Sequence, residues 1–328
     1  MTVLIVGAGL IGSATAWRLA QAGARVTLAD AGRFGGETSS AGAGMLSPGG
    51  EFDRASVWLD LGIEGLRMYP AFVDELRSET GVPVDFERCG CLHLVEPEQA
   101  HARASFQSAS GIRVDLRAEG LFYPDDAFVD PTDMLRALRR VCQTRNVEIA
   151  ENHPIPQIES TGYDAVVIAA GAWSREIRVT FRGAPVALPE VKPIKGHLIG
   201  FDLSPGALGP MLRRGHTYVL QRSNGFTIAG STEEDAGFDR SVNAATCQQI
   251  HGAAAQLFPA LEGATPSKSW IGFRPYSTKP HIRRVDGTNV WLAYGHFRNG
   301  ILLAPLTAGR IAAEITAQSS GTVHFSPH

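Results

Sequence analysis

The hydrophobic positions of the first thirty residues follow a regular order of runs and breaks. Thr2 to Val6 is a short apolar, β-branched run that predicts a buried strand, and Ser13 to Gln21 has the apolar spacing of a helix. Arg25 to Ala29 predicts a second strand. The order strand, helix, strand indicates the βαβ unit from which parallel sheets are built.

Beyond this unit the pattern predicts two longer helices. Ala55 to Thr80 has helical spacing with a break or kink at Pro70. Asp130 is a suitable N-cap, and Pro131 fits the first position of a helix that runs to about Arg145. The predicted strands of this part of the chain are Cys91 to Val95, Val147 to Ala150 and Ala165 to Ala170. The last of these is an apolar run suited to a buried parallel sheet.

A different pattern follows in the next part of the chain. Three β-rich segments separated by turns such as Asn224-Gly225 predict an antiparallel set of strands: Gly196 to Asp202, Thr217 to Arg222 and Phe226 to Ser231. A helix is predicted from about Ala244 to Phe258. The chain then returns to a strand at Val290 to Tyr294 and a helix from about Gly300 to Ala317.

The succession parallel, antiparallel, parallel predicts an α/β (α+β) fold. We expect a Rossmann-like domain in discontinuous segments that holds an inserted antiparallel-sheet domain, with a ligand crevice between the two. The length of 328 residues and a hydrophobic content of 44% also favour about two domains.

The turn of the first βαβ unit carries candidate chemistry. Gly7, Gly9 and Gly12 have the GxGxxG spacing, which lets the backbone approach a pyrophosphate at the positive N-terminus of the following helix. Asp30 ends the second strand, where a carboxylate accepts hydrogen bonds from a ribose and disfavours the 2′-phosphate of NADP. The segment therefore predicts dinucleotide binding. FAD and NAD both remain open, because both contain an ADP half.

Charge and cysteine content exclude several classes of function. A formal net charge of -3 gives no bulk attraction to nucleic acid or to an anionic membrane, so we expect neither partner. The four cysteines, Cys89, Cys91, Cys142 and Cys247, are too scattered for a disulfide framework. There is no HExxH motif or paired CxxC motif, so a metal is not expected.

Two apolar segments of the chain bear on its expected localisation. The apolar start lacks a basic n-region, which argues against a signal peptide. Ile301 to Ala313 is interrupted by Pro305 and Arg310 and does not predict a membrane span. We expect a cytoplasmic protein, and a homo-oligomer is compatible with the sequence.

Several motifs in order along the chain carry a resemblance to a known family. They are the fingerprint with Asp30, the small-residue loop Thr38 to Leu46, the run Val166 to Ser174, Pro193 to Gly196, Gly272 to Pro275, and GHFRNGILLAP at Gly295 to Pro305. Together they resemble the D-amino-acid oxidase family of FAD enzymes, and within it most closely the glycine oxidases. The last motif is the most specific, because short glycine-rich loops recur in many flavoproteins.

The resemblance implies a set of substrate-side residues. Arg274 matches an arginine that clamps the substrate carboxylate, Tyr218 a tyrosine that assists it, and Arg298 a further arginine near the substrate. His216 matches an active-site histidine, and Met45 is expected to contribute as well. From the residues alone, a surface ion pair for Arg274, a core role for Tyr218 and helix capping around Arg298 stay open as alternatives.

The resemblance also implies a set of FAD contacts. The expected cofactor-binding residues are Gly7, Gly9, Leu10, Ile11, Gly12, Asp30, Ala31, Thr38, Ser39, Ala43, Gly44, Met45, Ile155, Gly171, His296, Phe297, Arg298, Asn299, Gly300, Ile301 and Leu302. Residues 296–302 match the loop that lies along the flavin ring. That loop holds no cysteine, so we expect the FAD to be bound non-covalently.

The implied reaction is oxidative deamination of glycine or a small D-amino acid. Hydride passes to the flavin, the imino acid hydrolyses to an oxo acid and ammonia, and dioxygen is reduced to hydrogen peroxide. A dehydrogenase that passes electrons from N-methyl or cyclic amino acids, such as sarcosine or D-proline, to a carrier is an alternative, as is a dinucleotide-binding protein without turnover.

Two departures from the family pattern affect these expectations. Glu233 stands where glycine oxidases have a methionine near the substrate, and a carboxylate there would attract a substrate ammonium group or repel its carboxylate. The link from Glu151 to Asp164 is shorter than in relatives, so we expect a trimmed β-meander that keeps Ile155.

The expected domain boundaries follow from the same reading. Residues 1–76, 126–187 and 268–328 are assigned to the FAD-binding domain. Residues 77–125 and 188–267 are assigned to the substrate-binding domain.

Overall fold

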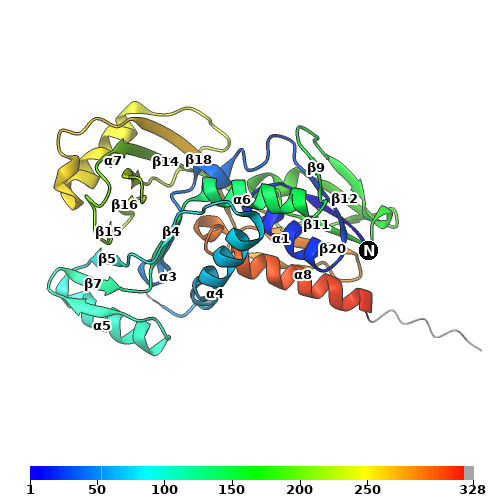
Figure 1. Cartoon of the computed structure of the whole chain (residues 1–328), viewed down its shortest axis with the longest axis horizontal. Helices are drawn as coiled ribbons and strands as arrows, with labels where there is room; N and C mark the ends of the chain where they lie inside the picture. The colour runs from blue at the N-terminus through cyan, green and yellow to red at the C-terminus, as the bar shows by residue number, and fades with distance from the viewer. Residues whose placement is uncertain (53, 321–328) are drawn as a thin grey trace, which may run out of the picture.

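A six-stranded sheet forms the centre of one half of the molecule (Figure 1). The computed structural model describes residues 1–52 and 54–320. The strand order is β19-β20-β11-β1-β2-β9, and only β19 runs antiparallel to its neighbour. The strands are β1 (Thr2–Val6), β2 (Arg25–Ala29), β9 (Glu148–Ala150), β11 (Ala165–Ile168), β19 (His281–Arg284) and β20 (Val290–Tyr294). The predicted parallel sheet is thereby confirmed.

Four helices, α1 (Leu10–Gln21), α4 (Val57–Thr80), α6 (Pro131–Thr144) and α8 (Ala304–Ser320), pack together beside this sheet. They share one large hydrophobic core with the inner residues of β1 and β2. Trp17 of α1 is fully buried and meets Phe72 of α4 edge-on at 5.2 Å between ring centroids. The predicted N-cap of α6 is confirmed, since the Asp130 carboxylate accepts a hydrogen bond of 2.7 Å from the backbone N–H of Thr132.

A separate three-stranded sheet is formed by segments that follow β9 in the chain. It consists of β10 (Gln157–Glu159), β12 (Arg178–Phe181) and β13 (Ala184–Val186). Ile158 and Val179 belong to a second apolar cluster with Val6 and Ile168 of the six-stranded sheet. The short link after Glu151 is thus folded and packed.

The other half of the molecule is an eight-stranded sheet of order β18-β14-β17-β16-β15-β5-β7-β6. Its strands are β5 (Cys91–Leu94), β6 (Asp115–Arg117), β7 (Gly120–Tyr123), β14 (Lys192–Asp202), β15 (Met211–Arg214), β16 (Thr217–Gln221), β17 (Phe226–Gly230) and β18 (Lys268–Tyr276). Every pair is antiparallel except β5 with β15, so the expected antiparallel sheet has one parallel pair. α5 (Pro97–Ala109) and α7 (Ala244–Leu257) belong to this half.

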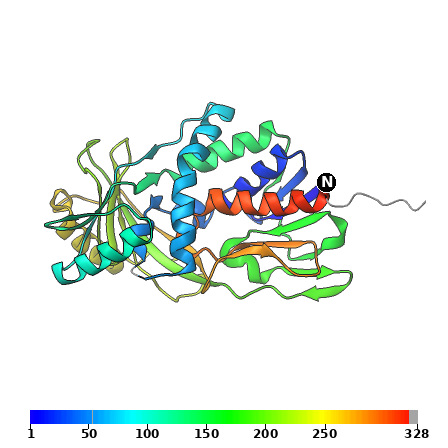
Figure 2. The same ribbon diagram turned by 90° about the horizontal axis from the view of Figure 1, so that it is seen from below.

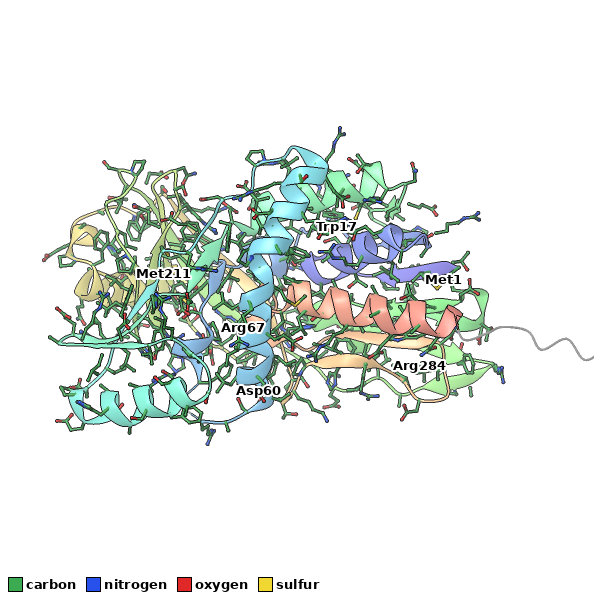
Figure 3. The ribbon with its side chains drawn as sticks, turned by 60° about the horizontal axis from the view of Figure 1, so that its bottom comes forward. Met1, Trp17, Asp60, Arg67, Met211 and Arg284 are labelled. Atoms are coloured by element: carbon green, nitrogen blue, oxygen red, sulfur yellow. The ribbon has the colours of Figure 1, made fainter. Side chains whose placement is uncertain are left out.

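Helix α4 stands between the two halves when the molecule is seen from below (Figure 2). Figure 3 shows Asp60 and Arg67 on this helix, with Met211 of β15 on one side and Trp17 of α1 on the other. A small sheet of β3 (Met45–Leu46), β8 (Ala127–Val129) and β4 (Phe86–Glu87) also links the halves. Short helices complete the chain: α2 (Thr38–Ala41), α3 (Pro48–Glu51), η1 (Ser160–Gly162), η2 (Gly171–Glu176), η3 (Pro259–Leu261) and η4 (Phe297–Asn299).

Three expected elements differ in the structure. The last helix begins at Ala304 rather than Gly300, after the 3₁₀ turn η4, and Pro305 lies in its first turn, where the missing N–H costs nothing. Helix α4 begins at Val57 and is continuous through Pro70, because buried neighbours such as Tyr69 and Phe72 hold it in the core. The small-residue loop expected at Thr38 to Leu46 begins with the single helical turn α2.

The expected domain boundaries remain a proposal. β18 begins at Lys268, the residue at which the last FAD-binding segment was expected to begin, yet it pairs with β14 over nine residues in the eight-stranded sheet. Among residues 1–52 and 54–320, the structure has no helix that combines the length and the apolar character needed to cross a bilayer.

Candidate active site

The turn between β1 and α1 excludes side chains at two of its glycines. Gly7 has a φ of +111°, and a β-carbon there would lie 2.4 Å from the carbonyl oxygen of Ala169. A β-carbon on Gly12 would lie 1.9 Å from the carbonyl oxygen of Gly7. The close packing of strand, turn and helix therefore depends on glycine at both positions, as the fingerprint requires.

Asp30 lies beside this turn at the carboxyl end of β2. Its carboxylate accepts hydrogen bonds from the backbone N–H of Ala8 at 2.7 Å and of Gly32 at 2.8 Å. Ser39 of α2 reaches the same place, where its Oγ accepts a 2.9 Å hydrogen bond from the N–H of Leu10, the first residue of α1. Donors of a helix N-terminus and the oxygens of a carboxylate thus lie together at one end of the site.

A continuous cavity of about 630 Å³ runs from this turn to the segment around residue 300. Of the expected cofactor-binding residues, all except Gly12 line it. Gly12 lies beneath the turn, where its role is packing against Gly7. The cavity wall also includes residues that were not expected there, among them Arg33, Glu37, Glu51, Trp173 and Arg240.

The loop of residues 296–302, which was expected to lie along the flavin, is anchored to α8 through His296. His296 is buried, and its Nε2 lies 2.9 Å from the hydroxyl of Thr307 in α8. Burial lowers the pKa of His296 to about 3, so this side chain is neutral at physiological pH. The carbonyl of His296 accepts from the N–H of Asn299 at 2.9 Å, which closes the turn η4.

Arg274 of β18 lines the cavity and is fixed by two hydrogen bonds. Its Nη1 donates to the carbonyl oxygen of Thr232 at 2.8 Å and its Nη2 to the hydroxyl of Ser231 at 2.9 Å. Gly196 of β14 makes room for this guanidinium, because a β-carbon there would lie 2.3 Å from Nη1. Each terminal nitrogen carries two N–H groups, so each retains one for a further partner.

Tyr218 of β16 lies in the same part of the site, near enough for the charge of Arg274 to act on its hydroxyl. It is buried and lines the cavity, and a β-carbon on Gly230 would come within 2.9 Å of its hydroxyl oxygen. Burial raises the pKa of Tyr218, although the nearby charges of Arg274 and Arg298 act in the opposite direction. The side chain is therefore a neutral phenol that can donate a hydrogen bond.

The structure brings Arg298, Glu233 and His216 together at the rim of the site. Arg298 Nη1 bonds Glu233 Oε1 and lies 3.4 Å from Nδ1 of His216. Arg298 lines the cavity, whereas Glu233 and His216 are absent from its wall, and His216 has a side chain that is 76% exposed. Glu233 thus pairs with Arg298 instead of standing free before a substrate.

Glu51 of α3 is a site residue that the sequence did not reveal. Its Oε1 lies 2.9 Å from Nη1 of Arg213 and 3.2 Å from Nη2 of Arg298. Burial raises the pKa of Glu51, but the two guanidinium groups outweigh it and lower the pKa below its usual value. The segment before it, Pro48-Gly49-Gly50, gives no periodic signal, so only the fold could bring this carboxylate to the cavity.

The wall of the cavity fits a flavin dinucleotide. The α1 N-terminus suits phosphates and Asp30 suits a ribose. Apolar residues such as Met45, Ile301 and Leu302 also line the cavity, and apolar side chains of this kind suit the faces of a flat ring. Among the described residues, no three potential metal-ligating side chains gather into a group.

Comparison with known proteins defines the class. Residues 2–315 match the family model of the DAO FAD-dependent oxidoreductases, and the chain belongs to this family. It is 32% identical over 99% of its length to the bifunctional protein ThiO/ThiG of a Synechocystis strain, of which it covers 53%. It is 29% identical over 99% of its length to the glycine oxidase of Pseudomonas aeruginosa, of which it covers 97%.

A solved structure gives the same result. The glycine oxidase of Geobacillus kaustophilus superimposes with a TM-score of 0.87 at 30% identity, covering 96% of this chain and 94% of that one. The fold class expected from the sequence is thereby confirmed, and FAD is the cofactor. The protein is an amino-acid oxidoreductase of the FAD-dependent type.

Proposed function

We propose that the protein oxidises glycine or a small D-amino acid to the corresponding oxo acid and ammonia. The observation that carries this proposal is Arg274, whose guanidinium is anchored by Thr232 and Ser231 yet retains one N–H on each terminal nitrogen beside the cavity. A pair of N–H groups in one plane is the geometry that binds a carboxylate through two hydrogen bonds.

Tyr218 and the anchored Arg274 fix the substrate. The phenol donates a hydrogen bond to the same carboxylate, and the two contacts together orient the Cα–H bond relative to residues 296–302. Anchoring the guanidinium before the substrate arrives reduces the entropy lost on binding.

The charge of the second arginine is compensated before any substrate binds. Glu51 and Glu233 both pair with Arg298, which leaves Arg274 as the cation that receives the substrate carboxylate. Hydride transfer requires that the amino group of the bound amino acid is neutral. If this amino group loses its proton in solution before binding, the described wall need not supply a strong base.

Bound FAD would supply the acceptor for the hydride from Cα, and dioxygen would serve as the final electron acceptor, giving hydrogen peroxide. The imino acid product loses its nitrogen by reaction with water, which gives the oxo acid and ammonia.

We further propose that residues 1–76, 126–187 and 268–328 form the FAD-binding domain, and that residues 77–125 and 188–267 form the substrate-binding domain.

An anaerobic visible spectrum tests the proposed function. Purified holoenzyme is mixed in turn with glycine, D-alanine, D-proline and sarcosine, and the flavin absorbance is followed before air is admitted. Rapid bleaching by glycine or D-alanine, followed by one hydrogen peroxide per oxidised amino acid, is the expected result. Bleaching by D-proline or sarcosine alone, with no peroxide on aeration, would instead indicate a dehydrogenase of cyclic or N-methyl amino acids.

A further inference from the structure

Residues 232–243, which we call the strap, join β17 to α7 and are tied to β14 through the buried side chains of Lys195 and His197. The ammonium of Lys195, only 2% exposed, lies 2.6 Å from Oδ2 of Asp239. The ring of His197 is buried as well, with Nδ1 2.7 Å from Oε1 of Glu234 and Nε2 accepting from the N–H of Asn243 at 3.0 Å. Both ends of the strap are thereby fixed.

Between these anchors the strap reaches the cofactor cavity. Phe238 stacks on Trp173, which lines the cavity, with ring centroids 4.8 Å apart and planes at 18°. The same ring meets Phe273 of β18 edge-on at 5.4 Å. Arg240, two residues after Phe238 in the strap, lies in the wall of the cavity.

Arg240 crosses to the loop that begins α2. Its Nη1 lies 3.1 Å from Oε2 of Glu37 and its Nη2 3.0 Å from Oε1, a two-bond pairing of guanidinium and carboxylate. Glu37 also lines the cavity and precedes Ser39 by two residues. Ser39 accepts from the first N–H of α1, the place suited to the phosphates. The pair therefore lies at the phosphate end of the site.

We propose that the strap forms one wall of the FAD site and that the Arg240–Glu37 pair closes this wall and slows release of the cofactor. Glu37 and Arg240 both line the cavity and come from segments 203 residues apart, so their pairing joins two separate parts of its wall. Two parallel charge-assisted bonds give the contact more directional strength than a single exposed ion pair.

The rate of FAD release measures this role. Holoenzyme is diluted, and the recovery of fluorescence by released FAD is followed for the wild type and for R240A, E37Q and the double variant R240A/E37Q. Each single variant is expected to release FAD about three- to tenfold faster, as loss of one paired contact predicts. The double variant is expected to match R240A, because both changes remove the same contact.

R310A is the matched control. Arg310 pairs with Glu64 at 2.5 Å, and the two side chains are 46% and 48% exposed, compared with 60% and 45% for Arg240 and Glu37. R310A should leave the release rate unchanged. A release rate for R240A within twofold of that for R310A overturns the proposal. It is equally overturned if E37Q has no effect, or if the effects of the two single variants multiply in the double variant.

Discussion

The carboxylate of Glu51 lies 3.2 Å from the guanidinium of Arg298, and this contact joins α3 to the 296–302 loop. The same oxygen of Glu51 pairs with the buried Arg213 of β15 at 2.9 Å. One carboxylate therefore connects a short helix, a strand of the eight-stranded sheet and the 296–302 loop, and its charge balances two cations at the edge of the cavity.

Loss of this carboxylate should destabilise the protein. In Glu51→Gln the guanidinium of Arg213 stays buried without a charged partner, which typically costs about 3 kcal/mol or more. Urea unfolding of the FAD-free protein measures the change in the free energy of unfolding. Glu64→Gln, which removes the exposed partner of Arg310, serves as the control and should cost less than about 1 kcal/mol. Equal losses for the two variants would contradict the structural role of Glu51.

Replacement of Arg274 should affect substrate binding far more than cofactor binding. Arg274→Ala removes both N–H groups offered to the carboxylate, and we expect KM to rise by about 100-fold or more. Arg274→Lys should be intermediate, because an ammonium cannot reproduce the planar pair of donors. Steady-state kinetics and the flavin spectrum are measured together. Unchanged turnover in Arg274→Ala would falsify the assignment of the clamp.

Glu233 should tune KM through Arg298. The Glu233→Gln substitution removes one of the two carboxylates that pair with Arg298. The site then becomes more positive and attracts the substrate carboxylate more strongly. We expect KM to fall by about two- to fivefold with kcat little changed, and the effect to diminish at high ionic strength. Kinetics at two salt concentrations provide the test. A rise in KM would instead indicate that Glu233 itself binds the substrate amine.

The fingerprint glycines allow a test of local geometry. Gly12→Ala places a β-carbon 1.9 Å from the carbonyl oxygen of Gly7, so the turn must deform and FAD should bind poorly. Gly252→Ala in α7 meets no atom within 4 Å apart from its chain neighbours and the backbone of its own helix, and it should stabilise the protein by about 0.5–1 kcal/mol through better helix propensity. FAD titration and thermal unfolding of both variants distinguish the two effects.

The contribution of Asp126 to the free energy of unfolding should fall as the pH rises. It is buried and bonded to the hydroxyl of Ser47, and burial raises its pKa to about 8. Because its ordinary pKa of 3.8 applies to the unfolded chain, the folded protein binds more protons between about pH 4 and pH 8, and stability decreases with pH across that range. His93, whose pKa burial lowers to about 3, acts in the opposite direction below about pH 6.5.

The comparison of Asp126→Asn with the wild type isolates this contribution, since the histidines are common to both. The variant should gain stability relative to the wild type as the pH is raised from 5 to 8. Urea midpoints measured at several pH values give the difference. A constant difference over this range would show that Asp126 does not titrate there.

The sequence by itself determined the features that depend on neighbours along the chain. β1 and β2 have the predicted bounds, and the spacing of Gly7 and Gly12 already indicated the close turn, because GxGxxG acts through local backbone geometry. Arg274 and Tyr218 were found only through the resemblance to a family, since a single polar residue on a strand carries no periodic signal.

Tertiary structure alone decided how the charges of the site are arranged. Glu51 meets Arg213 across 162 residues, and Arg240 meets Glu37 across 203, so neither pairing leaves a pattern in the sequence. The start of α8 at Ala304 was likewise decided by the turn before it, in which Phe297 has a positive φ of 48°. The physical reason is that electrostatic partners are chosen by distance in space, and that distance exists only after the sheets have brought their loops to one cavity.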